Sequence, residues 1–368
     1  MPRGVALKIN SIRLGSINGA HFFLTLRGNQ MSNSAKDKFN FKSSTRKKEN
    51  SESIQLNSLL THLQHPKSKK EFQDAEEPDA VKVSEYWGKR NAFVKDLNVS
   101  FEFFPPREKL SSQSLMEVYK ELGKINPEYF SVTFGAMGSS QSPTFDTVSN
   151  IAKETNVPVM PHISCIRTTR SQVIDLVDKY IEQGISQIMV LRGDIPERMI
   201  NNGDFKYASD LVRFIKERYE NIDICVAAYP EKHPQSQCLS KDIDFFIEKV
   251  HSGATKAITQ YFYNPDAYFF FVDELQRRNI DIPITPGIMP ITSFDKLTKF
   301  SKVCGAEIPT WILNNLKLYK NDSESLRQFG QDVVNEMCLK LKQNGVRRFH
   351  FYSMNEVEPV LTLSKNLI

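Results

Sequence analysis

Short β-type apolar segments alternate with longer segments of helical period from about Val81 to the end of the chain, and this alternation restricts the fold more than any other feature. The helix-period segments include 171–184, with a polar start and a glycine stop, and 207–219. Strands are predicted at 98–104, 129–134, 158–163, 187–191, 222–229, 256–260, 283–287 and 347–351. Eight strand–helix units in about 270 residues predict an α/β fold of the TIM (β/α)8 barrel type. A doubly wound open sheet is the alternative, but no glycine-rich dinucleotide fingerprint follows any strand.

Residues 1–80 differ in composition from the rest of the chain. The segment from Phe39 to Lys70 is rich in Ser, Lys, Asn and Gln, which predicts disorder. The first acidic residue is Asp37, and an acid-free, arginine-bearing N-terminus is typical of an organelle transit peptide. The alternatives are an extension without catalytic relevance and a translation start assigned upstream of Met31. We therefore expect a basic and polar extension at 1–80 and the barrel at 81–368.

Charge, apolar content and cysteine usage narrow the class of protein. The net charge is +5, but the excess comes largely from the N-terminal extension, so we expect no nucleic-acid binding by the folded part. No apolar run is long enough to cross a bilayer, so we expect no membrane association. The five cysteines never form a CxxC pair, which is typical of reduced cysteines in a cytoplasmic protein and indicates neither disulfides nor a zinc site.

The first predicted strand carries a carboxylate in the stretch NVSFEFFPPRE. In an extended strand Phe101 and Phe103 share one face, and Glu102 points to the other. Pro105 and Pro106 end the strand just after the acid. Glu102 therefore lies either on the solvent face of a surface strand or at the mouth of a barrel.

Polar residues stand at the ends of six consecutive predicted strands, where a TIM barrel builds its active site. They are Glu102, Thr133, His162, Arg192 to Asp194, Tyr229 and Gln260. This convergence favours an inward-pointing Glu102. Each residue also has a structural alternative. His162 is then a hydrogen-bonded histidine, because a metal site would need further ligands at suitable spacing, and no metal site is predicted. Residues 192–194 are then an ordinary polar turn, and Gln260 is a buried amide tied to the backbone. Lys249, taken alone, is typical of a surface lysine.

Nine motifs occur in the order and spacing of one known family: NVSFEFFPPR, SVTFGA, PHISC, VLRGD, YASDLV, AAYPEKHP, AITQYF, PGIMPITSF and HFYSMN. From about Tyr86 to the C-terminus the chain resembles the catalytic barrel of bacterial-type methylenetetrahydrofolate reductases. The resemblance implies a flavoprotein in which NADH or NADPH reduces FAD, and the reduced flavin then passes hydride to methylenetetrahydrofolate. The product is methyltetrahydrofolate for methionine synthesis, and a cytoplasmic homo-oligomer is implied.

The resemblance also assigns roles to individual residues. Glu102 matches the general acid, and its phenylalanine surroundings suggest a pKa raised by desolvation. Asp194 matches an aspartate near the flavin and the pterin. Gln260, Phe300 and Lys296 stand at substrate-binding positions. The FAD-binding positions are Thr133, Phe134, Ala136, His162, Arg192, Gly193, Ala208, Tyr229, His233, Asp242 and Lys249.

Two positions depart from the family pattern. Lys296 replaces a glutamine near the substrate, and Glu356 replaces an arginine after HFYSMN. The departures concern recognition of the glutamate tail of folate and leave the flavin assignment intact. Two other function classes remain as alternatives: another flavin-dependent barrel such as a proline dehydrogenase, and a non-catalytic barrel that binds folate or flavin.

Overall fold

The computed structural model describes residues 97–106, 109–134, 142–193 and 203–368. The predicted extension at 1–80 and the candidate residues Ala136 and Asp194 lie outside these ranges. Among the described residues, no helix combines the length and the apolar character needed to cross a membrane.

The strands form one parallel sheet that curls into a nearly closed barrel. Its order is β7-β6-β5-β4-β3-β2-β1-β9-β8. Every paired neighbour is parallel, so the carboxyl ends of the strands meet at one end of the barrel. The strands are β1 Asn98–Phe103, β2 Phe130–Val132, β3 Val159–Ser164, β4 Gln187–Leu191, β5 Asp223–Ala228, β6 Lys256–Thr259, β7 Ile284–Thr285, β8 Gly287–Ile288 and β9 Arg348–Tyr352.

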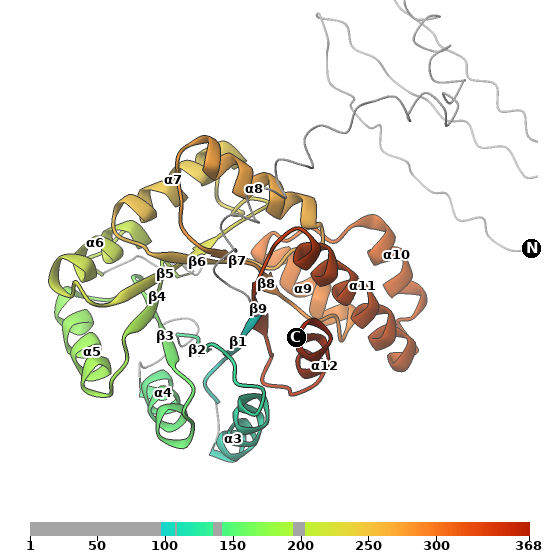
Figure 1. Cartoon of the computed structure of the whole chain (residues 1–368), viewed down its shortest axis with the longest axis horizontal. Helices are drawn as coiled ribbons and strands as arrows, with labels where there is room; N and C mark the ends of the chain where they lie inside the picture. The colour runs from blue at the N-terminus through green and yellow to red at the C-terminus, as the bar shows by residue number, and fades with distance from the viewer. Residues whose placement is uncertain (1–96, 107–108, 135–141, 194–202) are drawn as a thin grey trace, which may run out of the picture. The chain divides into compact units, whose positions relative to one another are not determined.

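Helices follow the strands and surround them (Figure 1). Within the described residues they are α3 Lys109–Gly123, α4 Ser142–Glu154, α5 Arg170–Glu182, α6 Ala208–Arg218, α7 Leu239–His251, α8 Pro265–Arg277, α9 Phe294–Cys304, α10 Thr310–Leu318, α11 Ser323–Gln343 and α12 Val360–Leu367. Local chemistry fixes their ends. For α5, Thr169 and Gln172 form a reciprocal capping box, and Gly184 follows the last turn with a φ of 78°.

Strand alternation divides the apolar side chains into two layers. Side chains on the outer face, such as Phe101 and Phe103 of β1, pack in the large core between the strands and the helices. The inner face carries a smaller cluster inside the barrel, formed by Tyr129, Met160, Met189, Cys225 and Ile258. The barrel is therefore filled by side chains and is not a pore.

The TIM-barrel prediction is confirmed, with one local difference. The strand predicted at 283–287 is divided into β7 and β8. Pro286 between them has no backbone N–H to donate, although its carbonyl accepts a hydrogen bond from the His350 amide at 3.0 Å. β7 pairs with β6 and β8 pairs with β9, so this interrupted segment joins the two edges of the sheet.

Candidate active site

Glu102 points into the barrel. In the parallel register it lies beside Ser131 of β2 and Tyr352 of β9, and Ser131 lies beside Met160 of β3. Met160 belongs to the inner cluster, so the Glu102 side chain shares the inner face. The Glu102 side chain is 19% exposed, so the carboxylate lies at the mouth of the barrel, where it is partly buried but still reached by solvent.

Two buried imidazoles flank the Glu102 carboxylate. Its Oε2 lies 3.6 Å from His162 Nε2 and 3.8 Å from His350 Nε2. Burial lowers the pKa of His162 to about 4; His350 lowers it further, whereas Glu102 opposes the shift. His162 is therefore neutral at neutral pH. Its Nε2 is buried and makes no hydrogen bond to the described residues.

The phenylalanines of the first strand do not surround Glu102, contrary to the sequence-based rationale. Phe101 stacks on Phe351 with ring centroids 5.8 Å apart, and Phe103 contacts Phe130, all in the outer core. Phe104 is 43% exposed. The Glu102 carboxylate instead lies beside the imidazoles of β3 and β9, because alternation places Phe101 and Phe103 on the opposite face of the strand.

The segment after β9 holds the end of β1 in place. The Ser353 hydroxyl donates a hydrogen bond to the Glu102 carbonyl at 2.6 Å. Asn355 accepts from the Phe104 amide at 3.1 Å and donates to the Phe104 carbonyl at 2.9 Å. These three contacts fix the backbone that carries the acid, which gives the HFYSMN motif a structural role.

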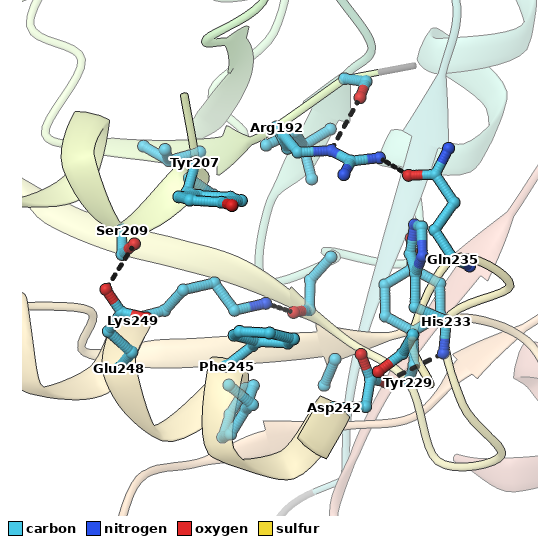
Figure 2. A pocket seen from close by; sticks show the side chains of 18 of the residues that line it. Arg192, Tyr207, Ser209, Tyr229, His233, Gln235, Asp242, Phe245, Glu248 and Lys249 are labelled. Atoms are coloured by element: carbon cyan, nitrogen blue, oxygen red, sulfur yellow. Dashed lines mark hydrogen bonds between the residues drawn. The ribbon is translucent and has the colours of Figure 1, made fainter. Parts of the chain in front are cut away.

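A cavity of about 280 Å³ opens beside the carboxyl ends of β4 and β5, against α6 and α7 (Figure 2). Seven of the residues predicted to bind the cofactor line it: Arg192, Gly193, Ala208, Tyr229, His233, Asp242 and Lys249. Tyr207 and Phe245 also line it, and Figure 2 shows their rings on different sides of the cavity, with the Lys249 ammonium between them in this view. The cavity therefore combines cations with flat apolar surfaces.

The charged side chains of the cavity are held by specific contacts. Lys249 donates to the Ala227 carbonyl, and burial lowers its pKa to about 8, although Asp242 and Cys225 oppose the shift. Asp242 accepts from the His233 amide at 2.9 Å. Arg192 donates to the side chain of Gln235. Lys249 lies in the last turn of α7, so a helix N-terminus does not assist it.

Gly193 lies where β4 leaves the barrel and where a side chain does not fit. Its φ is 84°, which glycine adopts readily and other residues rarely do. A Cβ at this position would stand 2.2 Å from Ser164 Oγ. The Ser164 hydroxyl is itself engaged, because it donates to the Arg192 carbonyl at 3.1 Å. The glycine thus lets the strand end pass close to β3 at the edge of the cavity.

A family model described as methylenetetrahydrofolate reductase matches residues 89–367. The 5,10-methylenetetrahydrofolate reductase of Pectobacterium carotovorum subsp. carotovorum is 36% identical over 262 residues, which cover 71% of this chain and 87% of that protein. The chain belongs to the methylenetetrahydrofolate reductase family.

Methylenetetrahydrofolate reductases are oxidoreductases, and the chain is an enzyme of this class. The methylenetetrahydrofolate reductase 1 of Schizosaccharomyces pombe is 34% identical over 277 residues, covering 73% of this chain and 45% of that protein. A solved structure of an uncharacterized protein from Clostridium thermocellum, described as binding two copies of 5-methyl-5,6,7,8-tetrahydrofolic acid, aligns with a TM-score of 0.53 and 16% identity over 76% of this chain and 97% of that one. At that identity the likeness shows the fold alone.

The two positions expected to depart from the family pattern, Lys296 and Glu356, lie together. Lys296 and Phe300 of α9 line a small hollow with Met289 and Met354. The Lys296 ammonium lies 3.9 Å from the Glu356 carboxylate, and both side chains are more than half exposed. The two residues expected to depart from the family pattern therefore form an exposed ion pair with each other.

The remaining candidates have separate surroundings. Thr133 follows β2, and its carbonyl accepts from the Thr144 hydroxyl at 3.0 Å. Phe134 packs against the outer core. The Gln260 side chain accepts from the Tyr261 amide at 3.0 Å, as the backbone-tied alternative expects. The roles of all the candidate residues stay predictions, and Ala136 and Asp194 lie outside the described ranges.

Sequence reasoning missed several residues of the site. His350 and Ser100 lie behind Glu102, and Gln235, Tyr207 and Phe245 line the cavity. The inward position of His350 could have been predicted from the sequence. In the last strand His350 stands between Phe349 and Phe351, so its side chain points to the opposite face, which is the interior of the barrel. Among the described residues, no group of three or more His, Cys, Asp or Glu side chains is arranged to hold a metal ion.

Proposed function

We propose that this chain is a flavin-dependent methylenetetrahydrofolate reductase that uses NADH or NADPH as reductant and forms methyltetrahydrofolate for methionine synthesis. The observation that carries the proposal is the position of Glu102, an acid held at the mouth of the barrel and flanked by buried imidazoles. Family membership supports the reaction class. The reductant, the cofactor and the order of the two half-reactions are part of the proposal.

The residues of the cavity fit FAD. Arg192 and Lys249 are cations suited to a diphosphate, and Tyr207 and Phe245 offer flat faces suited to an aromatic ring system. His162 does not line this cavity; its Nε2 is buried beside Glu102 without a hydrogen-bond partner among the described residues. Gly193, whose backbone lies close to Ser164 of β3, also lines the cavity.

When bound, FAD supplies the hydride that is accepted from the nicotinamide and delivered to the folate. The chain supplies the proton. A protonated Glu102 protonates methylenetetrahydrofolate so that the methylene bridge opens to an electrophilic iminium. General acid catalysis of this kind contributes about 10²–10⁴-fold to a rate. Because His162 is neutral at neutral pH, it places no positive charge beside Glu102 that would favour the ionised carboxylate over the protonated acid.

Other residues of the chain position the substrates in this proposal. Gln260 binds the folate, and Phe300, which is 38% exposed on α9, packs on the nicotinamide or the folate in turn. Asp194 hydrogen-bonds the pterin and favours the developing cation. Use of one site by both substrates gives ping-pong kinetics. We further propose that residues 81–368 are the catalytic unit, that the chain acts in the cytoplasm, and that it assembles as a homo-oligomer.

The test is an anaerobic visible spectrum of the purified protein, titrated with NADH and then with methylenetetrahydrofolate. Flavin absorbance should bleach with NADH and return with the folate, while methyltetrahydrofolate forms in equal amount. Bleaching without return on folate addition would favour another flavin-dependent barrel. A protein that cannot be reconstituted with FAD would favour the non-catalytic binding alternative.

A further inference from the structure

We propose that His350 is a positioning residue for Glu102, and that Ser100 and His350 together complement the Glu102 carboxyl in both its protonated and its ionised state. The inference rests on the proposed function, since it concerns the acid of the folate half-reaction. No resemblance assigned a role to either residue.

His350 is completely enclosed, with 0% exposure, on the inner face of β9. Its ring stacks on Tyr129, with centroids 5.8 Å apart, and meets Tyr352 edge-on at 5.5 Å. These contacts fix the plane of the imidazole. Its Nε2 is then aimed at Glu102 Oε2, 3.8 Å away, and at Ser131 Oγ, 3.4 Å away.

The other ring nitrogen of His350, Nδ1, contacts a serine hydroxyl. His350 Nδ1 lies 2.8 Å from the Ser100 hydroxyl oxygen. The same hydroxyl lies 3.4 Å from the Phe349 carbonyl, to which it can donate. The Ser100 hydroxyl also hydrogen-bonds the Tyr129 side chain. Ser100 can donate to Nδ1 or to the Phe349 carbonyl, and whether it donates to or accepts from Nδ1 sets the tautomer of His350.

The two arrangements match the two states of the acid. When Ser100 donates to Nδ1, the imidazole proton resides on Nε2 and faces an ionised Glu102 carboxylate. When Ser100 donates to the Phe349 carbonyl, Nδ1 carries the proton and the Nε2 lone pair faces a protonated Glu102. Rotation of one hydroxyl thus lets His350 present either an N–H or a lone pair to Glu102, 3.8 Å away, as the acid loses and regains its proton.

Two substitutions at one position separate this role from simple packing. In His350→Asn the amide occupies the place of Nδ1 and keeps the Ser100 contact, but it falls short of Glu102. In His350→Gln the amide extends to the place of Nε2 and restores a partner for Glu102. Met189→Leu is the matched control, because Met189 lies in the inner cluster of the same barrel and the change conserves volume.

Anaerobic stopped-flow measurements should split the two half-reactions. Reduction of bound FAD by NADH should match the parent protein in all three variants. Reoxidation by methylenetetrahydrofolate should slow about tenfold or more in His350→Asn, a part of the 10²–10⁴-fold range of general acid catalysis, and recover substantially in His350→Gln. Equal rates in the Asn and Gln variants, or a parallel loss in both half-reactions, would overturn the inference.

A spectroscopic measurement tests the contact without turnover. In protein labelled with [¹⁵N]histidine, the His350 signals are those lost in His350→Asn. Glu102→Gln should shift the ring-nitrogen signals of His350, and Ser100→Ala should shift its Nδ1 signal, with the signals of His251 on α7 unchanged. Unshifted His350 signals in both variants would overturn the inference. If the parent protein never reoxidises with folate, the proposed function fails, and these spectra still decide whether His350 and Glu102 are coupled.

Discussion

The mouth of the barrel around Glu102 and the cavity beside α6 and α7 are built from different parts of the fold. Glu102, His162 and His350 are all carried on strands, and both imidazoles are almost fully enclosed. The cavity is lined largely from helices and from the segment after β5, and its rings at Tyr207 and Phe245 are 45% and 53% exposed.

The difference corresponds to two chemical requirements. Proton transfer needs heavy atoms fixed to a fraction of an ångström, and parallel strands inside a packed barrel supply that rigidity. Holding an anionic, aromatic ligand needs accessible cations and flat surfaces, which helices and loops present at the rim. Changes at the mouth should therefore alter one chemical step, and changes in the cavity should alter retention of the ligand.

Glu102→Gln gives the sharpest separation of the two regions and the largest expected effect. The variant should bind FAD and accept electrons from NADH, because the cavity is untouched. Folate reduction should fall by about 10²–10⁴-fold, because the amide cannot donate a proton as an acid does. Stopped-flow absorbance at the flavin band measures both half-reactions.

The matched control is Glu117→Gln, an exposed carboxylate on α3 that should leave both half-reactions unchanged. A normal rate of methyltetrahydrofolate formation in Glu102→Gln would remove Glu102 from the acid role. Loss of FAD from the variant would show instead that the two regions are not separable.

Gly193→Ala tests the junction between the two regions, with Gly184→Ala as its partner. Both glycines have positive φ, but an added Cβ meets nothing within 4 Å at Gly184 and meets Ser164 Oγ at Gly193. Gly184→Ala should lower the free energy of unfolding by about 1–2 kcal/mol through backbone strain alone. Gly193→Ala should lower it by about 3 kcal/mol, because overpacking adds a further 1–3 kcal/mol. Urea denaturation measures both, and equal losses would exclude a steric role for Ser164.

The barrel was predictable from the sequence because its signal is local and repeated. Helical period, the polar start and the glycine stop predicted a helix at 171–184, within a few residues of the observed α5, Arg170–Glu182. The seventh strand was less regular, since a proline in its middle permits pairing to a different neighbour on each side. That pairing depends on closure of the sheet, which no local pattern encodes.

The site was predictable in part. The motifs assigned Arg192, His233 and Lys249 to one binding site, and in the structure these three residues line one cavity. The surroundings of Glu102 were not predicted, because its partner His350 lies 248 positions later in the chain, and the two meet only through the pairing of the first and last strands. Alternation indicates that such residues face inward, but it does not say which of them touch.

Lys249 offers a smaller and pH-dependent test of the cavity. Its pKa in the protein is lowered to about 8, so the lysine is charged below that pH and increasingly neutral above it. An anionic ligand binds the charged form better, so FAD affinity should fall as the pH rises through 8, by about tenfold between pH 7 and pH 9. Lys249→Arg should remove this dependence, because arginine stays charged.

Fluorescence titration with FAD across the same pH range measures the effect. Lys241→Met is the control, since Lys241 is an exposed lysine on the same helix that pairs with Asp244 and does not line the cavity. The stability of the ligand-free chain should rise between pH 8 and 10.5, because there the unfolded lysine binds more protons than the folded one. An FAD affinity that is flat from pH 7 to 9 in the parent protein would separate Lys249 from the ligand.

The Lys296–Glu356 pair should give the smallest effect, because both side chains are well exposed and solvent screens them. The resemblance places both positions near the folate, whose glutamate tail is anionic. Glu356 repels such a tail and attracts the Lys296 ammonium, so Glu356→Gln should lower the KM for a polyglutamylated folate by roughly two- to threefold at low salt and not at high salt. Adding Lys296→Gln should reverse the gain, whereas Glu274→Gln, which breaks an ion pair in the last turns of α8, should leave the KM unchanged. If the KM at low salt is unchanged by both substitutions, the folate tail does not pass this pair. The departure from the family pattern then has no effect on folate recognition.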